Sequence, residues 1–83
     1  MFIIYWLLSE NYNKTYVGFS DEIKRRIKEH KNGQVSTTKD FGKFRCFKLE
    51  EVISLKEARE REKYWKSSAG RKKLKKIFRQ LKN

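Results

Sequence analysis

The sequence predicts a small α+β domain, a three-stranded antiparallel sheet flanked by helices in the order strand, strand, helix, strand, helix, helix. An unbroken apolar run near the N-terminus is followed by turn residues and a second short β-prone segment. Three later segments combine helical spacing of apolar residues with helix start and stop residues. The chain has 83 residues, no proline and no internal repeat. We therefore expect residues 1–83 to form a single domain.

The first two strands are predicted from apolar and turn-forming residues. The segment from Phe2 to Leu8 is continuously apolar or aromatic, which is typical of a strand covered on both faces. Residues 10–13, Glu-Asn-Tyr-Asn, carry turn chemistry, and residues 15–17 form a second short strand that Gly18 ends. The two strands are expected to form a hairpin.

The first helix is expected to begin at Ser20, an N-cap residue followed by two acidic residues, and to run to about Lys31. Asn32-Gly33 closes it, and a polar loop extends to Gly42. A third strand is predicted near residues 44–53.

The last two helices are predicted from a capping pattern and from a change in composition. Ser54 and Glu57 form a capping box for the second helix. Residues 67–70, Ser-Ser-Ala-Gly, interrupt the helical pattern, and a very basic third helix follows over residues 69–81.

The charge of the chain indicates its partner. It carries 22 Lys and Arg against 10 Asp and Glu, a net charge of +12. Such an excess repels itself, and nucleic acid is the partner that best offsets it; an anionic membrane or a merely solubilising charge are the alternatives. Hydrophobic residues make up 37% of the chain, which is enough for a packed core and argues against disorder.

Cysteine and histidine are too rare to build a metal centre of their own. With one cysteine and one histidine, a disulfide framework and a Cys/His zinc site are both excluded. A metal would need oxygen ligands, which suits magnesium or manganese. Cys46 lies among apolar residues and is expected to be a small core residue. The N-terminal apolar run is too short to span a membrane, and we expect a cytoplasmic protein.

On the first helix, the wheel places Ile23 and Ile27 on the buried stripe, with His30 within about 20° of Ile23 and Arg26 within about 60°. Arg25 points nearly opposite, into solvent. Spacing alone favours ordinary roles for these polar residues, an arginine at the edge of the stripe and a satisfied interfacial histidine.

On the second helix, Glu62 is the least expected residue. Leu55, Ala58 and Trp65 define the apolar face, and Glu62 falls within that arc, about 20° from Leu55. A carboxylate there is costly unless it is paired or binds a cation. The pattern leaves a buried salt bridge and a metal ligand equally open.

Together these residues form an ordered set with Tyr5 and Tyr16, two strand tyrosines that by themselves are more often core residues. Tyr16-Val17-Gly18 reads as Y-[IV]-G, Arg26 and His30 follow at plus ten and plus fourteen, and Glu62 comes later. The set resembles the GIY-YIG nuclease family over nearly the whole chain. It is most similar to the short stand-alone bacterial members and, more distantly, to the nuclease module of nucleotide excision repair. Ile3 stands where the family has the first glycine, and its common asparagine after the second helix has no match.

The resemblance implies a DNA endonuclease that hydrolyses a phosphodiester bond with one divalent metal, Mg or Mn, and no small-molecule cofactor. Tyr5, with Tyr16 beside it, would orient or deprotonate water, with nearby cations favouring the phenolate. Arg26 would clamp the phosphate, His30 would hydrogen-bond a tyrosine or the phosphate, and Glu62 would hold the metal. We expect the tyrosines, Arg26 and Glu62 to line one surface of the sheet.

The DNA partner, with branched or damaged DNA among the candidate substrates, is expected to contact two basic or polar segments. The predicted contacts in the loop and on the third helix are Thr37, Thr38, Lys39, Arg71, Lys72, Lys73 and Lys76. One alternative is a weak or inactive nucleic-acid-binding module of the same fold, and another is an unrelated basic RNA-binding protein.

Overall fold

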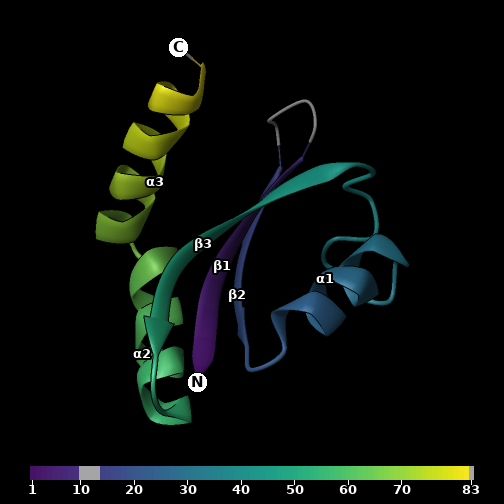
Figure 1. Ribbon diagram of the computed structural model, residues 1–83. Helices are drawn as coiled ribbons and strands as arrows, with labels where there is room; N and C mark the ends of the chain where they lie inside the picture. The colour runs from purple at the N-terminus through teal and green to yellow at the C-terminus, as the bar shows by residue number, and fades with distance from the viewer. Residues whose placement is uncertain (10–13, 83) are drawn as a thin grey trace.

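The computed structural model describes residues 1–9 and 14–82 (Figure 1). The strands are β1 (Phe2–Ser9), β2 (Thr15–Ser20) and β3 (Phe44–Val52), and the helices are α1 (Ile23–Lys31), α2 (Leu55–Lys66) and α3 (Ser68–Lys82). The strands form one sheet in the order β2-β1-β3, with both pairings antiparallel. The predicted α+β class and the order of elements are confirmed. The turn predicted at residues 10–13 lies outside the described residues.

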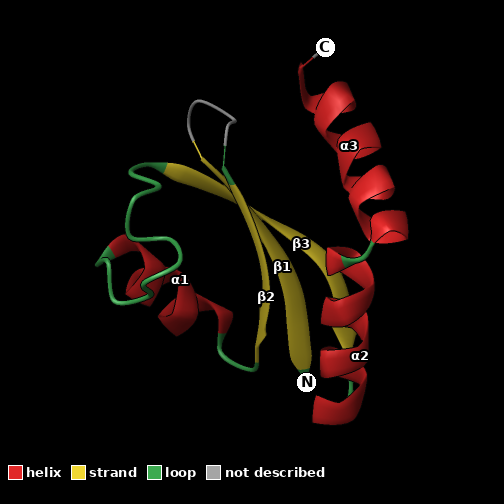
Figure 2. Cartoon of the chain, turned by 180° about the vertical axis from the view of Figure 1, so that it is seen from behind, coloured by secondary structure: helices red, strands yellow, loops and turns green. Residues whose placement is uncertain are grey.

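The central strand β1 is buried on both faces, because helices cover the sheet from two sides (Figures 1 and 2). Alternate residues of a strand point to opposite faces. Ile4, Trp6 and Leu8 join the core cluster that α2 and α3 complete. Tyr5 points the other way, toward α1, where it meets His30. The fold therefore separates an apolar α2–α3 face from a polar and aromatic α1 face.

The α2–α3 face is closed by a tight junction between the two helices. Ser67, in an extended conformation, ends α2, so the interruption predicted over residues 67–70 is confirmed at Ser67, whereas residues 68–70 already belong to α3. An ideal Cβ on Gly70 would lie 2.3 Å from the Tyr64 carbonyl oxygen, so only glycine lets α3 start this close to α2. Trp65, which is 7% exposed, donates its indole N–H to Glu50 from β3 and fills the corner.

Two predicted element boundaries are wrong. Helix α1 begins at Ile23, and its N-cap residue is Glu22, whose side chain makes no capping hydrogen bond. Ser20 is instead the last residue of β2, paired with Ile3, and its hydroxyl accepts the Glu22 N–H at 3.0 Å. Gly18 does not end β2, because pairing with β1 continues past it. At α2, by contrast, Ser54 accepts the Glu57 N–H as predicted.

Four predicted core positions are also more exposed than expected. Cys46 lies on β3, which is an edge strand, and is exposed rather than packed in the core. Leu55, the first residue of α2, is 42% exposed because it lies at the helix end. Ile23 and Ile27 are half-buried and line a shallow hollow. Ala58 and Trp65 are buried as predicted.

Candidate active site

Four of the five predicted site residues, Tyr5, Tyr16, Arg26 and His30, meet on the α1 face of the sheet. The Tyr5 hydroxyl and His30 Nε2 are 2.8 Å apart. The Tyr16 ring centroid lies 5.1 Å from that of His30 and 6.1 Å from that of Tyr5. Residues of β1, β2 and α1 thus form one aromatic and polar cluster.

Gly18 makes room for the two tyrosines. It follows Tyr16 by two residues, on the same face of β2, and it pairs with Tyr5 across the sheet. A Cβ at Gly18 would lie 2.8 Å from both the Tyr5 hydroxyl oxygen and a Tyr16 ring carbon. The glycine of the Tyr16-Val17-Gly18 motif is therefore required by packing, because any side chain would push the tyrosines away.

Arg26 joins the cluster from the first half of α1. Its interaction with the Tyr5 hydroxyl is the main cause that raises the pKa of Arg26, followed by its hydrogen bond to Glu29. The guanidinium lies 3.0 Å from the Glu29 carboxylate, and its side chain is 34% exposed. Arg25 instead points into solvent and pairs with Glu22, which confirms the predicted difference between the two arginines.

His30 is buried, with hydrogen bonds on both ring nitrogens. Nε2 faces Tyr5, and Nδ1 lies 2.6 Å from the hydroxyl oxygen of Thr38. The Thr38 hydroxyl donates to the Val35 carbonyl, so its oxygen is left to accept from the imidazole. This assigns the proton of neutral His30 to Nδ1 and leaves Nε2 to accept the Tyr5 hydroxyl proton. Burial, and then the charge of Arg26, lowers the pKa of His30, which favours this neutral form.

The two tyrosines differ in access to solvent. Tyr5 is 0% exposed, and burial raises its pKa above the usual value. Arg26 lowers the pKa of Tyr5, as expected of a nearby cation, but burial outweighs it, so the Tyr5 hydroxyl stays protonated in the free protein. Tyr16 is half-buried. It is therefore the tyrosine that solvent can reach.

Glu62 belongs to α2, which packs against the other face of the sheet from α1. Its side chain is 25% exposed, and its carboxylate lies 3.6 Å from the ammonium of Lys66, one turn later. That ammonium lies 6.0 Å from the centre of the Tyr16 ring. The distance from the Glu62 carboxylate to the centre of the Tyr16 ring is therefore at most the sum of these two distances. Glu62 approaches the cluster at the β2 edge, through Lys66, rather than joining it directly. The expectation that Glu62 lines the same surface of the sheet as Tyr5 is therefore wrong, because α2 packs on the opposite face.

A metal ion would have few protein ligands here. In the part of the chain that the structure describes, no three His, Cys, Asp or Glu side chains gather where they could hold a metal. Mg²⁺ is commonly bound by one or two carboxylates, completed by water and substrate phosphate oxygens. The partly exposed Glu62 carboxylate fits this sparse kind of site.

The predicted nucleic-acid contacts lie in two places. Thr37 and Lys39 are exposed on the loop after α1, whereas Thr38 is 2% exposed and turned inward to His30. On α3 all four predicted basic contacts, Arg71, Lys72, Lys73 and Lys76, are exposed. They lie with α2 on the side of the sheet opposite α1, and the Lys73 ammonium sits 5.3 Å from the centre of the Tyr64 ring. The structure does not bring this basic helix to the tyrosine cluster.

Sequence reasoning missed two neighbours of the cluster, Thr38 and Lys66. Thr38 reaches His30 through the fold of an irregular loop, which no periodicity predicts. Lys66 did have a signal, since it follows Glu62 by four residues, the spacing of neighbours on a helix.

Comparison with known proteins identifies the family. The family model described as the GIY-YIG catalytic domain matches residues 1–75. The chain belongs to the GIY-YIG nuclease family. No curated protein and no solved structure gives a significant match. Among the helices of residues 1–9 and 14–82, none is long and apolar enough to cross a membrane.

Proposed function

We propose that this protein is a metal-dependent DNA endonuclease that hydrolyses a phosphodiester bond at the cluster on the α1 face. The observation that supports it most is the joint placement of Tyr16, Arg26 and His30 around Tyr5 in a fold that belongs to a nuclease family. An aromatic core without chemistry has no need for an arginine and a doubly hydrogen-bonded histidine within it.

The half-buried Tyr16 is our choice for the residue that orients the attacking water, since the Tyr5 hydroxyl is closed off from solvent. Tyr5 has a positioning role in this scheme. Its hydroxyl donates to His30 and lies close enough to Arg26 to raise the pKa of the guanidinium, which helps to hold Arg26 in place. Arg26 then binds the non-bridging oxygens of the phosphate and stabilises the charge that develops on them.

Glu62 would hold the single Mg²⁺ or Mn²⁺ ion, which when bound supplies charge stabilisation for the leaving 3′ oxygen. Lys66 competes for the same carboxylate in the free protein, 3.6 Å away. Because Lys66 is half-exposed and flexible, it can turn toward a DNA phosphate when the metal binds.

A second function, a nucleic-acid-binding module without cleavage, is favoured by one observation. Arg26 already has a carboxylate partner in Glu29, and an arginine neutralised in this way attracts a phosphate less strongly. A cleavage assay distinguishes the two functions.

Nicking of a supercoiled plasmid, with Mg²⁺ or Mn²⁺ and with chelator, tests the proposal. Arg26→Gln and Tyr16→Phe should each slow metal-dependent nicking, the arginine change by about 10²–10³-fold if the guanidinium stabilises the transition state. Arg25→Gln is the matched control, because it removes the same charge one residue away at a solvent-exposed position. It should change the rate by less than about twofold. Absence of metal-dependent nicking, or equal losses in the two arginine variants, would leave only the binding module.

DNA as the partner is tested by salt dependence. Affinity for duplex DNA should fall steeply as salt rises, and replacing Lys72, Lys73 and Lys76 by glutamine should weaken binding and flatten that dependence without changing sequence preference. An unchanged slope would show that α3 faces away from the bound DNA.

A further inference from the structure

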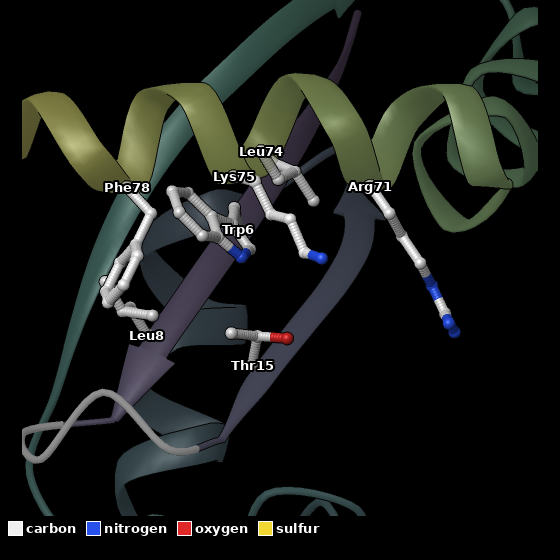
Figure 3. Close-up of a pocket in the computed structure, with 7 residues that line it drawn as sticks. All are labelled: Trp6, Leu8, Thr15, Arg71, Leu74, Lys75 and Phe78. Carbon is white, nitrogen blue, oxygen red and sulfur yellow. The ribbon is translucent and has the colours of Figure 1, made fainter.

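A pocket lies between α3 and the hairpin of β1 and β2, on the side of the sheet away from the tyrosine cluster (Figure 3). Its volume is about 340 Å³. The side chains that line it are Trp6, Leu8, Thr15, Arg71, Leu74, Lys75 and Phe78. The tyrosine cluster makes no use of this pocket.

The pocket contains an unsatisfied hydrogen-bond donor. Trp6 is 2% exposed, and its indole N–H has no acceptor among residues 1–9 and 14–82. In Figure 3 the indole nitrogen is turned toward the same space as Thr15 and Lys75. The other tryptophan differs, because Trp65 donates its N–H to Glu50. A buried donor without a partner is costly, so native proteins rarely keep one unless a ligand or water completes it.

The lining of the pocket defines the chemistry of that ligand. Arg71 and Lys75 bring two positive charges, and none of the described lining residues is acidic. Leu8, Leu74 and Phe78 supply apolar and aromatic surface beside the indole. The complementary molecule is flat and apolar on its faces, carries hydrogen-bond acceptors on its edge, and is negatively charged at one end.

We propose that the pocket binds one unpaired nucleotide of single-stranded DNA. The base packs against Phe78 and Trp6 and accepts the Trp6 indole N–H, and Arg71 and Lys75 contact the adjoining phosphates. The volume is at the lower end of the roughly 300–1,000 Å³ typical of small-ligand sites, which suits a single nucleotide. A base pair within a duplex, whose faces are already stacked on its neighbours, does not fit this chemistry.

This inference rests on the proposed nuclease function and narrows its substrate. Thr15, in the pocket, and Tyr16, in the candidate active site, are consecutive residues of the edge strand β2 and point to opposite faces. A DNA strand that passes around this edge reaches both sites. The substrate class is therefore DNA with a single-stranded segment next to the bond that is cut.

The test follows the indole N–H signals of Trp6 and Trp65 in ¹H–¹⁵N NMR spectra of the full chain. A Trp65→Phe variant shows which signal belongs to which tryptophan. Without metal, a short oligothymidylate should shift the Trp6 signal strongly and the Trp65 signal little, because Trp65 already has an acceptor. Duplex DNA of the same length and phosphatidylglycerol vesicles are the comparison ligands. A Trp6 signal unmoved at saturating oligothymidylate, or moved only by vesicles, would overturn the proposal.

Affinity measurements by fluorescence anisotropy supply a matched pair of variants. Lys75→Gln and Lys76→Gln remove the same charge from adjacent exposed positions, but only Lys75 lines the pocket. Lys75→Gln should weaken oligothymidylate binding at least about threefold more than Lys76→Gln does, and Phe78→Leu should weaken it at least about fivefold. Equal effects of the two lysine variants would overturn the pocket. Plasmid nicking is measured separately. A shifted Trp6 signal without nicking would refute the nuclease proposal alone, and nicking with an unmoved Trp6 signal would refute the pocket alone.

Discussion

Replacing Glu62 by glutamine separates a chemical role of this carboxylate from a structural one. In the structure the Glu62 carboxylate lies 3.6 Å from the Lys66 ammonium, and the two side chains are 25% and 51% exposed. An exposed helical pair four residues apart contributes about 0.3–0.5 kcal/mol to the free energy of unfolding. Glutamine keeps the size of the side chain, so little else changes. The structure therefore predicts a nearly unchanged stability.

For a domain of this size, 1 kcal/mol shifts the melting temperature by about 4–8 °C. The Glu62→Gln protein should thus melt no more than about 4 °C below the wild type, as followed by circular dichroism without metal. Its metal-dependent nicking should fall at least about 100-fold, because an amide does not hold a hard divalent cation as a carboxylate does. Glu60→Gln, an exposed change on the same helix, is the control and should keep full activity.

The opposite pattern would refute this reasoning. A buried structural ion pair loses about 3–5 kcal/mol when one partner is removed. A melting temperature lowered to match, with nicking retained, would mean that Glu62 serves packing and that the metal, if any, lies elsewhere. Loss of nicking in Glu60→Gln would also refute a specific role for Glu62.

Two of three further predictions concern residues around the cluster, and the third concerns the α2–α3 junction. Thr38→Val leaves the His30 Nδ1–H without an acceptor and should lower the free energy of unfolding by about 1–3 kcal/mol, whereas Thr38→Ser should keep it; equal urea midpoints for both would contradict the hydrogen bond between Thr38 and His30. Because the pKa of His30 is lowered in the folded state, the unfolded chain binds the proton more tightly. The contribution of neutral His30 to the free energy of unfolding should be complete above about pH 6.5 and should fall as the pH drops below that value. The measurement is the difference in free energy of unfolding between the wild type and His30→Gln, and a difference that stays constant from about pH 5 to 8 would refute this. Gly70→Ala forces a Cβ against the Tyr64 carbonyl and should cost about 1–3 kcal/mol or more in calorimetry, and a wild-type melting curve would exclude the close α2–α3 junction.

The elements that the sequence predicts well are those with short-range signals. The apolar run of β1 and the Ser54 cap of α2 are local, and both lie where expected. Ser20 was misplaced because pairing with β1 extends β2 through it, and this pairing is a property of the sheet. Cys46 was misplaced because its exposure depends on β3 being an edge strand, which the composition of β3 does not reveal.

In the candidate site, too, the sequence predicted the local pattern but not the features that depend on the fold. The order and spacing of Tyr5, Tyr16, Arg26 and His30 indicated the cluster, and the structure brings these residues together. The exposure of each tyrosine was not predictable, because it depends on how α1 and its loop close over the sheet. For the same reason the inward turn of Thr38, predicted as a surface contact, depends on a loop conformation that its polar sequence does not define.

The way α1 is held on the sheet limits which variants can report on chemistry. A surface helix is usually fixed by an apolar stripe, but Ile23 and Ile27 are only half-buried, and His30 is the one buried residue of α1. The hydrogen bond between Tyr5 and His30 and the electrostatic interaction of Arg26 with Tyr5 therefore anchor the helix as well as arrange the cluster.

A Tyr5→Phe variant removes the hydrogen bond to His30 and the interaction with Arg26, so a loss of nicking in that variant would not show whether the hydroxyl or the position of α1 matters. Tyr16 has a smaller share in this anchoring: phenylalanine keeps its ring contacts with Tyr5 and His30, and its hydroxyl acts on Arg26 less than that of Tyr5 does. A loss of nicking in Tyr16→Phe with an unchanged melting curve would therefore report on the hydroxyl itself, and for that reason Tyr16 rather than Tyr5 is the informative tyrosine.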